Sequence, residues 1–346
     1  MNEQTAGTVD RMNRPLVVCS AYAPGTPVLE EDGVFAEAPD VAFVVRGPAR
    51  TPAQVIHAVG DADVVLHHIE PFTREVFAAL PRLRGIVRYG IGLDTIDVDA
   101  ATEYGVVVAN FPTVTTREVA HHALALMLAC AKKLLHLDHD IRSGARTTSV
   151  APMGSIYGET LGLIAFGNIP HQLAPRAQAL GMHVIAYDPS LPPENFVAAG
   201  VESVDLESVA RRSDYVSCHL PLTDETRDMI DASFFSKMKP TAFFINTARG
   251  AILKEADLVA ALREGRIAGA GLDVYEVEPP TPDNPLCAFD NVILTPHSAS
   301  HSDLARSTLH RRAALSALAL ARGGLPEHVV NPDALQHERW GGLRCT

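Results

Sequence analysis

The sequence lacks several features that would assign it to other classes of protein. It has no apolar run approaching the roughly 20 residues of a membrane-spanning helix. Its net charge of −12 argues against a basic surface for nucleic acid or anionic lipid. Its 5 cysteines are scattered without a Cys-x-x-Cys, and its polar first 14 residues contain no apolar signal core. We therefore expect a cytoplasmic protein in a reducing compartment, without nucleic acid or membrane as a partner.

The composition is that of a globular protein, and the order of its strands and helices indicates an α/β fold. The chain has 346 residues, 47% hydrophobic and 20% charged, and this length favours two domains. Apolar runs alternate with helical segments, which is typical of parallel sheets covered by helices. In the first part we predict strands at 16–22, 41–45, 64–67, 85–89 and 106–110, and helices at 52–59, 74–80 and 98–104.

A long helical pattern at 117–135 follows. Its apolar residues cover nearly every side, so we expect a helix that is buried all round, between two domains or two subunits. His121 and His122 lie on it without a His-Glu-x-x-His spacing, which favours packed or partly exposed histidines over a metal site. After a loop at 143–159, we predict strands at 161–166, 183–187, 215–219, 241–246, 269–274 and 292–294, helices at 171–180, 206–212, 254–263 and 305–321, and a loop-like end at 323–346.

Residues 160–190 form one βαβ unit, around which the rest of the chain is organised. A strand leads into a turn at Gly167, a helix follows, and a second strand ends at Asp188, 21 positions after that glycine. A carboxylate about 20 residues beyond such a turn hydrogen-bonds the adenosine ribose of a dinucleotide. It also repels a 2′-phosphate, so the predicted cofactor is NAD and not NADP.

The turn departs from the Gly-x-Gly-x-x-Gly fingerprint, which would place glycines at 165, 167 and 170. This chain has Ala165, Gly167 and Pro170. Gly167 still lets the backbone approach a pyrophosphate, and Pro170 is tolerated in a first helical turn. We expect Ala165 to need a negative φ. The motif alone is weak, and a βαβ unit that binds no nucleotide stays open as an alternative.

Polar residues also follow three later strands. These are Arg249, Asp273 with Glu278 beyond it, and His297. Ligands bind outside the carboxyl ends of parallel strands, so we expect these residues at the same edge as Gly167. Arginine suits a carboxylate, histidine can pass a proton, and the glutamate could orient the histidine. Together they suit the reduction of a 2-oxo acid beside a nicotinamide, although each alone could be a surface ion pair, a solvated charge or a packed histidine.

Seven stretches resemble the D-isomer-specific 2-hydroxyacid dehydrogenases, the family of phosphoglycerate, glycerate and D-lactate dehydrogenases. They are Tyr89-Gly-Ile-Gly-Leu-Asp-Thr-Ile-Asp97, Gly181-Met-His-Val-Ile-Ala-Tyr-Asp-Pro189, His219-Leu-Pro-Leu-Thr223, Met238-Lys-Pro240, Ile245-Asn-Thr-Ala-Arg-Gly250, Gly269-Ala-Gly-Leu-Asp-Val274 with Glu278-Pro279, and Asn291-Val-Ile-Leu-Thr-Pro-His297. The resemblance runs from about residue 50 to 310 in family order. Residues 87–92 and 165–169 look closest to the branch related to the C-terminal-binding-protein corepressors.

The resemblance implies an α/β fold of two Rossmann/flavodoxin-like parallel-sheet domains with a cleft between them. Residues 1–113, completed by 307–346, would bind the substrate, and residues 114–306 would bind NAD. The family is dimeric, and its core helix contact corresponds to the helix at 117–135, so a homodimer is expected.

The resemblance also implies residue roles. Arg249 would bind the substrate carboxylate and carbonyl oxygen, His297 would be the general acid and base, and Glu278 would hydrogen-bond His297. Backbone N–H groups of Ile91 and Gly92 would hold the carboxylate, and no metal is expected. The cofactor-binding residues would be Gly167, Asn168, Ile169, Asp188, His219, Leu220, Pro221, Thr247, Ala248, Arg249, Asp273, His297 and Ser300.

The favoured function is that of an NAD-dependent oxidoreductase that interconverts a small D-2-hydroxy acid and its 2-oxo acid. Asn168 stands where the family often has arginine, which removes one charged pyrophosphate contact. The altered fingerprint and the resemblance to the corepressor branch motivate the alternative, an NAD(H)-sensing, corepressor-like protein with little or no turnover. A relative acting on phosphorylated or phosphonate acids is a third. Arg46, Arg50 and Arg88 are candidates to bind such an anion, or are simply solvated surface charges.

Overall fold

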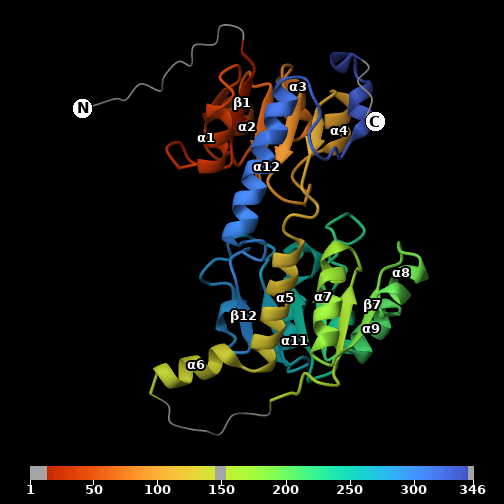
Figure 1. The fold of residues 1–346 in the computed structure, drawn as a ribbon. Coiled ribbons are helices and arrows are strands. Elements are labelled where there is room, and N and C mark those ends of the chain that lie inside the picture. Colours follow the sequence, from red (N-terminus) through yellow and green to blue (C-terminus); the bar gives the residue numbers. More distant parts are fainter. Residues whose placement is uncertain (1–13, 145–152, 342–346) are drawn as a thin grey trace. The chain divides into compact units, whose positions relative to one another are not determined.

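The chain divides into two compact units (Figure 1). The computed structural model describes residues 14–144 and 153–341, so most of the N-terminal tail, the middle of the loop at 143–159, and Cys345 lie outside the described residues. Unit 1 comprises Met1–Val114 and Asp303–Thr346, and unit 2 comprises Thr115–Ser302. The sequence placed the boundaries after residues 113 and 306. Each unit has one parallel sheet, so the predicted α/β fold class is confirmed.

The sheet of unit 1 has 5 strands in the order β2-β1-β3-β4-β5, and every strand pair is parallel. The strands are β1 (Leu16–Cys19), β2 (Ala42–Val45), β3 (Val64–His67), β4 (Gly85–Arg88) and β5 (Val107–Ala109). Side chains of successive residues point to opposite faces of a strand. Val17 and Cys19 of β1 accordingly lie in one hydrophobic core, and Leu16 and Val18 lie in the other.

Helices cover both faces of this sheet. They are α1 (Leu29–Ala36), α2 (Pro52–Val59), α3 (Arg74–Ala79), α4 (Val98–Glu103) and α12 (Asp303–Ala321), followed by the short 3-10 helices η3 (Pro332–Gln336) and η4 (Glu338–Trp340). Residues of α1 and α12 fill the first core, and residues of α2, α3 and α4 fill the second. The sequence analysis missed α1, and the predicted loop beyond residue 323 contains η3 and η4.

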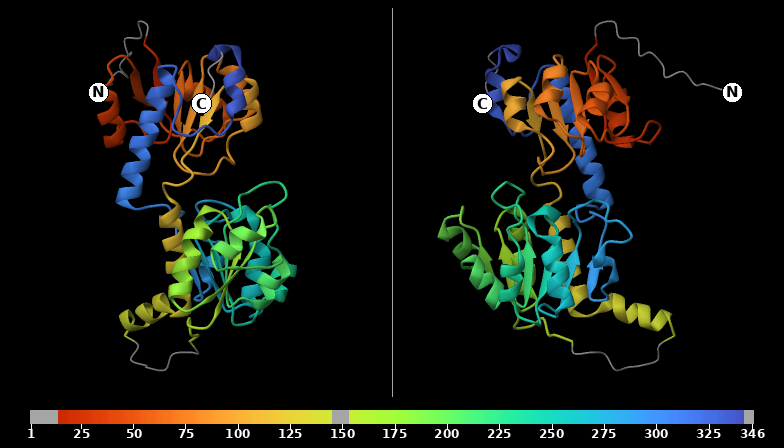
Figure 2. Two further views of the ribbon diagram at one scale, coloured as in Figure 1. Left: turned by 45° about the vertical axis from the view of Figure 1, so that its right-hand side comes forward. Right: turned by 180° about the vertical axis from the view of Figure 1, so that it is seen from behind.

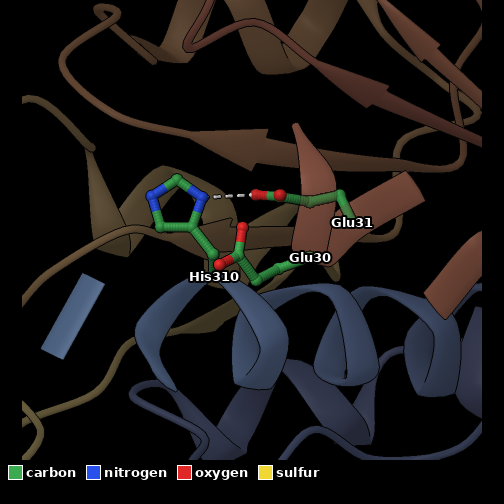
Figure 3. Close-up of side chains that lie close together, drawn as sticks. All are labelled: Glu30, Glu31 and His310. Atoms are coloured by element: carbon green, nitrogen blue, oxygen red, sulfur yellow. Dashed lines mark hydrogen bonds and ion pairs between the residues drawn. The ribbon is translucent and has the colours of Figure 1, made fainter. Parts of the chain in front are cut away.

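A buried polar contact joins α1 to α12 (Figure 3). Oε1 of Glu31 accepts hydrogen bonds from Nδ1 of His310 at 2.7 Å and from the Tyr89 hydroxyl at 2.5 Å. Burial acts to raise the pKa of Glu31, but these hydrogen bonds outweigh it and hold that pKa below its usual value. Glu30, Glu31 and His310 offer ligand atoms within 4.8 Å of one another. Both ring nitrogens of His310 are already hydrogen-bonded, one to Glu31 and the other to the Tyr22 hydroxyl, so we assign no ion to this cluster.

The sheet of unit 2 has 7 strands in the order β12-β11-β10-β9-β6-β7-β8. They are β6 (Thr160–Ile164), β7 (His183–Tyr187), β8 (Glu202–Ser203), β9 (Tyr215–Cys218), β10 (Phe243–Asn246), β11 (Gly269–Leu272) and β12 (Val292–Leu294). From β6 the chain first adds strands on one side and then returns to add β9 on the other. The carboxyl ends of β6 and β9 therefore flank the point where the strand order reverses, which is where open α/β sheets bind ligands.

Helices cover both faces of this sheet too. They are α5 (Thr116–Ala131), α6 (Leu134–Arg142), α7 (Asn168–Ala179), α8 (Pro193–Ala198), α9 (Leu206–Arg212), α10 (Ala232–Lys237) and α11 (Glu255–Arg263), with the 3-10 helices η1 (Gly250–Ile252) and η2 (Pro285–Ala288). Residues of α5, α7 and α8 share one core, and residues of α9, α10 and α11 share the other. Figure 2 shows these two helical layers in two further views, the right-hand one from behind. Within the described ranges, no helix is long and apolar enough to cross a membrane.

The prediction of a single long helix at 117–135 was wrong. The structure has two helices there, α5 and α6, because Lys133 adopts a left-handed φ of +50° that interrupts the helical hydrogen bonding. The expected burial between two domains or two subunits is not tested by the single chain. Leu134 and Leu135 are 53% and 54% exposed, and α6 buries none of its residues and extends away from the body of unit 2 (Figure 1). Apolar periodicity carries no signal for a single left-handed residue.

Candidate active site

The residues predicted to bind the cofactor or catalyse the reaction in unit 2 follow the carboxyl ends of its strands. Because the strands are parallel, these ends lie along one edge of the sheet. Gly167 follows β6, Asp188 follows β7, His219, Leu220 and Pro221 follow β9, Thr247, Ala248 and Arg249 follow β10, Asp273 and Glu278 follow β11, and His297 and Ser300 follow β12.

The turn after β6 corrects one prediction. Ala165 has a φ of +74°, not the negative φ expected for alanine. Two hydrogen bonds hold the chain there: the Ala165 N–H donates to the Tyr187 carbonyl at 2.8 Å, and the Phe166 N–H donates to Oδ2 of Asp188 at 2.9 Å. A left-handed non-glycine residue costs about 1–2 kcal/mol. The turn therefore keeps the backbone shape that glycine would adopt without strain.

The N-terminus of α7 offers donors to an anion. Gly167 is the N-cap, and a Cβ built on it would meet nothing within 4 Å, so the space in front of the turn is open. Asn168 and Ile169 are the first two residues of α7, where backbone N–H groups have no intrahelical acceptor. Pro170 follows and has no N–H. The helix terminus thus presents two backbone donors to a phosphate group.

Two buried polar atoms at this edge have no partner among the described residues. They are Oγ1 of Thr247 and Nδ1 of His219. Burial lowers the pKa of His219 to about 3, so its ring is neutral, and Nε2 lies 2.9 Å from Oγ of Ser217. Buried polar atoms are normally hydrogen-bonded. Their presence at two positions predicted to contact the cofactor fits the binding of a polar ligand there.

The turn that carries Arg249 is fixed by its neighbours. Asn246 accepts a hydrogen bond from the Ala248 N–H and donates one to the Arg249 carbonyl, both at 3.0 Å. A Cβ on Gly250 would collide with the backbone of Tyr275, so only glycine lets the two loops approach this closely. Arg249 therefore stands on a rigid turn beside the loop that contains Glu278. The sequence analysis gave Asn246 no role, although its place at the end of β10 marks it.

His297 and Glu278 meet directly. Nδ1 of His297 lies 2.6 Å from Oε2 of Glu278, whose Oε1 accepts the Tyr275 N–H at 3.2 Å. Both side chains are partly exposed, at 47% for the histidine and 33% for the glutamate. Burial acts to raise the pKa of Glu278, but the hydrogen bond and charge of His297 hold it below its usual value. The charge of Arg249 acts in the same direction.

The sequence analysis missed one histidine near this pair. Nε2 of His122, on α5, lies 3.0 Å from Oγ1 of Thr295 and 3.5 Å from Oδ1 of Asp273. His122 was expected to be packed or partly exposed, and its side chain is 24% exposed. No local pattern could have found this contact, because 173 residues separate His122 from Thr295.

In unit 1, Ile91 and Gly92 lie in the loop after β4. Nε of Arg88 donates to the Gly92 carbonyl at 2.9 Å, and Nη1 of Arg88 donates to the Tyr89 carbonyl. The Arg88 side chain thus holds the loop in place. Arg46 similarly donates to the Ala58 carbonyl at 3.1 Å. Arg88 is therefore not simply a solvated surface charge, whereas Arg46 is exposed.

The comparisons with known proteins agree with one another along most of the chain. The profile described as D-isomer specific 2-hydroxyacid dehydrogenase, NAD binding domain, matches residues 124–299. A glyoxylate reductase of Korarchaeum cryptofilum is 41% identical over 82% of this chain and 86% of its own length. A D-3-phosphoglycerate dehydrogenase of Methanocaldococcus jannaschii is 38% identical over 85% of this chain, which spans only 56% of that longer relative.

Solved structures that are similar to this chain agree with the sequence comparisons. The D-lactate dehydrogenase of Aquifex aeolicus, complexed with NAD and lactic acid, superposes with a TM-score of 0.82 at 25% identity, covering 91% of this chain and 99% of its own. A glyoxylate/hydroxypyruvate reductase of Sinorhizobium meliloti in complex with NADP and malonate gives 0.80 at 28% identity, covering 92% and 97%. These reductases and dehydrogenases give no support to the corepressor alternative. The chain belongs to the D-isomer specific 2-hydroxyacid dehydrogenase family and is an NAD(P)-dependent oxidoreductase that interconverts 2-hydroxy and 2-oxo acids.

Proposed function

We propose that this protein uses NADH to reduce a small 2-oxo acid to its D-2-hydroxy acid, and that the same site catalyses the reverse reaction. The observation that carries the proposal is the 2.6 Å contact of His297 with Glu278, beside Arg249 on its fixed turn. A guanidinium binds a planar carboxylate through two parallel hydrogen bonds. Arg249 is therefore assigned to the substrate carboxylate and carbonyl oxygen.

His297 is assigned the proton transfer. Glu278 accepts the Nδ1–H, which leaves Nε2 as the ring nitrogen that serves the substrate. NADH, when bound, supplies the hydride to the carbonyl carbon. The proton on Nε2 passes to the oxygen in reduction, and Nε2 removes it in oxidation. The ionised Glu278 stabilises the protonated ring.

The assigned cofactor is NAD and not NADP. Asp188 stands after β7 with Oδ1 bound to the Ser190 N–H at 3.0 Å and Oδ2 bound to the Phe166 N–H at 2.9 Å. These bonds fix an anionic group where the adenosine ribose is expected. The N–H groups of Asn168 and Ile169 are assigned to the pyrophosphate.

Unit 2 is assigned to the cofactor and unit 1 to the substrate. In unit 1, the N–H groups of Ile91 and Gly92 are assigned to the substrate carboxylate, and the Arg88 side chain supports their loop. Assembly as a homodimer is supported by α6, where exposed Leu134 and Leu135 leave apolar surface uncovered in the single chain. A cytoplasmic location fits the free cysteines of the described residues, of which three are buried and one, Cys287, is exposed.

The test is NADH oxidation, followed by absorbance, with a panel of 2-oxo acids that includes glyoxylate and phosphorylated and phosphonate members. We expect turnover with one or a few small acids and loss of turnover in Arg249→Gln. The surface variant Arg211→Gln, which breaks only an exposed ion pair with Glu207, is the control. NADH binding without turnover on any acid, or full activity in Arg249→Gln, would overturn the assignment.

A further inference from the structure

The backbone of the turn that carries His297 is strained. His297 has a φ of +51°, in the left-handed region that residues with a Cβ adopt at a cost of about 1 kcal/mol or more. Such a conformation persists only where surrounding contacts hold it. Some neighbouring group must therefore fix the backbone that aims the His297 ring.

Asp273 supplies those contacts. Its carbonyl oxygen accepts the His297 N–H at 2.8 Å, its Oδ1 accepts the Ser298 N–H at 2.9 Å, and its Oδ2 accepts the Ala299 N–H at 2.8 Å. Three successive backbone N–H groups of the turn thus donate hydrogen bonds to Asp273. The side chain of Asp273 is fully buried, where hydrogen bonds to a charged acceptor are short and strong.

The same carboxylate is tied to the rest of unit 2. The Thr295 hydroxyl donates to Oδ1 of Asp273 at 2.6 Å. Because that hydroxyl has only one hydrogen, its oxygen accepts from Nε2 of His122, 3.0 Å away. A chain of contacts therefore runs from α5 through His122, Thr295 and Asp273 to the turn.

We infer that Asp273 is a positioning residue for His297. It shapes residues 297–299 so that Nδ1 of His297 meets Glu278, and it acts on the reaction through that ring. The inference rests on the proposed role of His297 in proton transfer. The family resemblance gave Asp273 a direct contact with the cofactor, and the inference adds a positioning role to that expectation.

Asp273→Asn tests the inference. The amide keeps the shape of the carboxylate, but its NH₂ group faces a backbone N–H of the turn and cannot accept from it. We expect kcat to fall by about 10- to 100-fold, the scale of a misplaced catalytic group, while the Kd for NADH stays within about threefold. In a His297→Asn background, Asp273→Asn should cost nothing further, because it acts through the missing ring.

Two further variants separate positioning from a general loss of structure. Thr295→Val removes one donor to Asp273 and should lower kcat in the same direction by about threefold to tenfold, with NADH binding unchanged. Asp214→Asn changes another carboxylate of unit 2, bonded to the Thr160 N–H and Lys239 at the start of β9, and should leave kcat unchanged. Circular dichroism checks that each variant folds.

A readout without turnover completes the test. The downfield proton resonance of the His297–Glu278 hydrogen bond, identified by its loss in Glu278→Gln, should also disappear in Asp273→Asn. Its persistence, a further loss of kcat in the His297→Asn background, or an NADH Kd raised more than about tenfold would overturn the inference. An inactive wild-type protein would instead contradict the proposed function, and the resonance would still decide the role of Asp273.

Discussion

Nδ1 of His297 lies 2.6 Å from Oε2 of Glu278, although 19 residues separate them in the chain. The pKa of Glu278 is held below its usual value, so the glutamate is an anion at neutral pH and accepts the Nδ1–H. This contact fixes both the ring orientation and the nitrogen that faces a substrate.

Replacing His297 by asparagine should remove proton transfer and leave the cofactor site intact. We expect kcat to fall by about 10²-fold or more, the usual contribution of a general acid. NADH fluorescence titration should show a Kd within about threefold of the wild-type value, because asparagine is a polar side chain that fits in the space of the histidine. Near-normal kcat in this variant would remove His297 from the mechanism.

Asp188→Asn should relax the choice of cofactor. Asparagine can still accept the Phe166 N–H, but it does not repel a 2′-phosphate. The ratio of kcat/KM for NADH to that for NADPH should fall at least about tenfold, close to 1.4 kcal/mol. Glu202→Gln, in an exposed pair with Arg212, is the control and should leave the ratio unchanged. A ratio unaltered in Asp188→Asn would place the ribose elsewhere.

Ala165→Gly should stabilise the protein, which is the opposite of the usual effect of glycine. The φ of +74° costs alanine about 1–2 kcal/mol, while glycine adds about 0.4–1 kcal/mol of unfolded-state entropy. The free energy of unfolding should therefore rise by about 0.5 kcal/mol, measured by urea unfolding followed by circular dichroism. Ala125→Gly, in the exposed middle of α5, should lower it by about 1 kcal/mol. Two changes of the same sign would contradict this account.

Arg88→Met should weaken substrate binding without weakening cofactor binding. Methionine keeps apolar bulk but loses the donors to the Gly92 and Tyr89 carbonyls, so the loop with Ile91 becomes less ordered. KM for the preferred oxo acid should rise by about tenfold, with the NADH Kd unchanged. Arg46→Met, which loses a carbonyl contact elsewhere in unit 1, should leave KM unchanged. Equal effects of the two changes would indicate a general loss of stability.

His67 should make unit 1 less stable in mild acid. Burial, with the nearby charge of Arg88, lowers the pKa of His67 from its usual 6.5 to about 3. Between these values the unfolded chain binds a proton that the folded chain does not. The free energy of unfolding should therefore keep its full value above pH 6.5. It should fall by about 1.4 kcal/mol per pH unit as the pH drops toward 3.

His67→Gln measures this contribution, because glutamine can still donate to the Glu70 carbonyl that Nε2 of His67 contacts at 2.8 Å. Trp340, the 1 tryptophan of the chain, is buried in unit 1, so its fluorescence reports the unfolding of that unit. The pH slope should be shallower in His67→Gln by about 1.4 kcal/mol per unit. The exposed His57→Gln should keep the wild-type slope, and identical slopes in all three proteins would contradict the prediction.

The sequence by itself determined the fold class and which polar residues follow the strands of one sheet. Alternating strands and helices require parallel sheets, and parallel strands require their carboxyl ends to share an edge. From this, Arg249, Glu278 and His297 could be predicted to follow strands of the same sheet. These inferences succeed because they depend on local periodicity and on residue type.

Only the tertiary structure decided which hydrogen bonds hold the loops at that edge of the sheet in place. The left-handed backbone at Ala165 and His297 depends on hydrogen bonds from strands and loops that are distant in the chain. The links of His122 with Thr295, and of Asp273 with the turn after His297, arise because α5, β11 and β12 become neighbours only on folding. Local patterns report which face of an element is apolar, but not which distant donor will meet a carboxylate, because that depends on strand order and register.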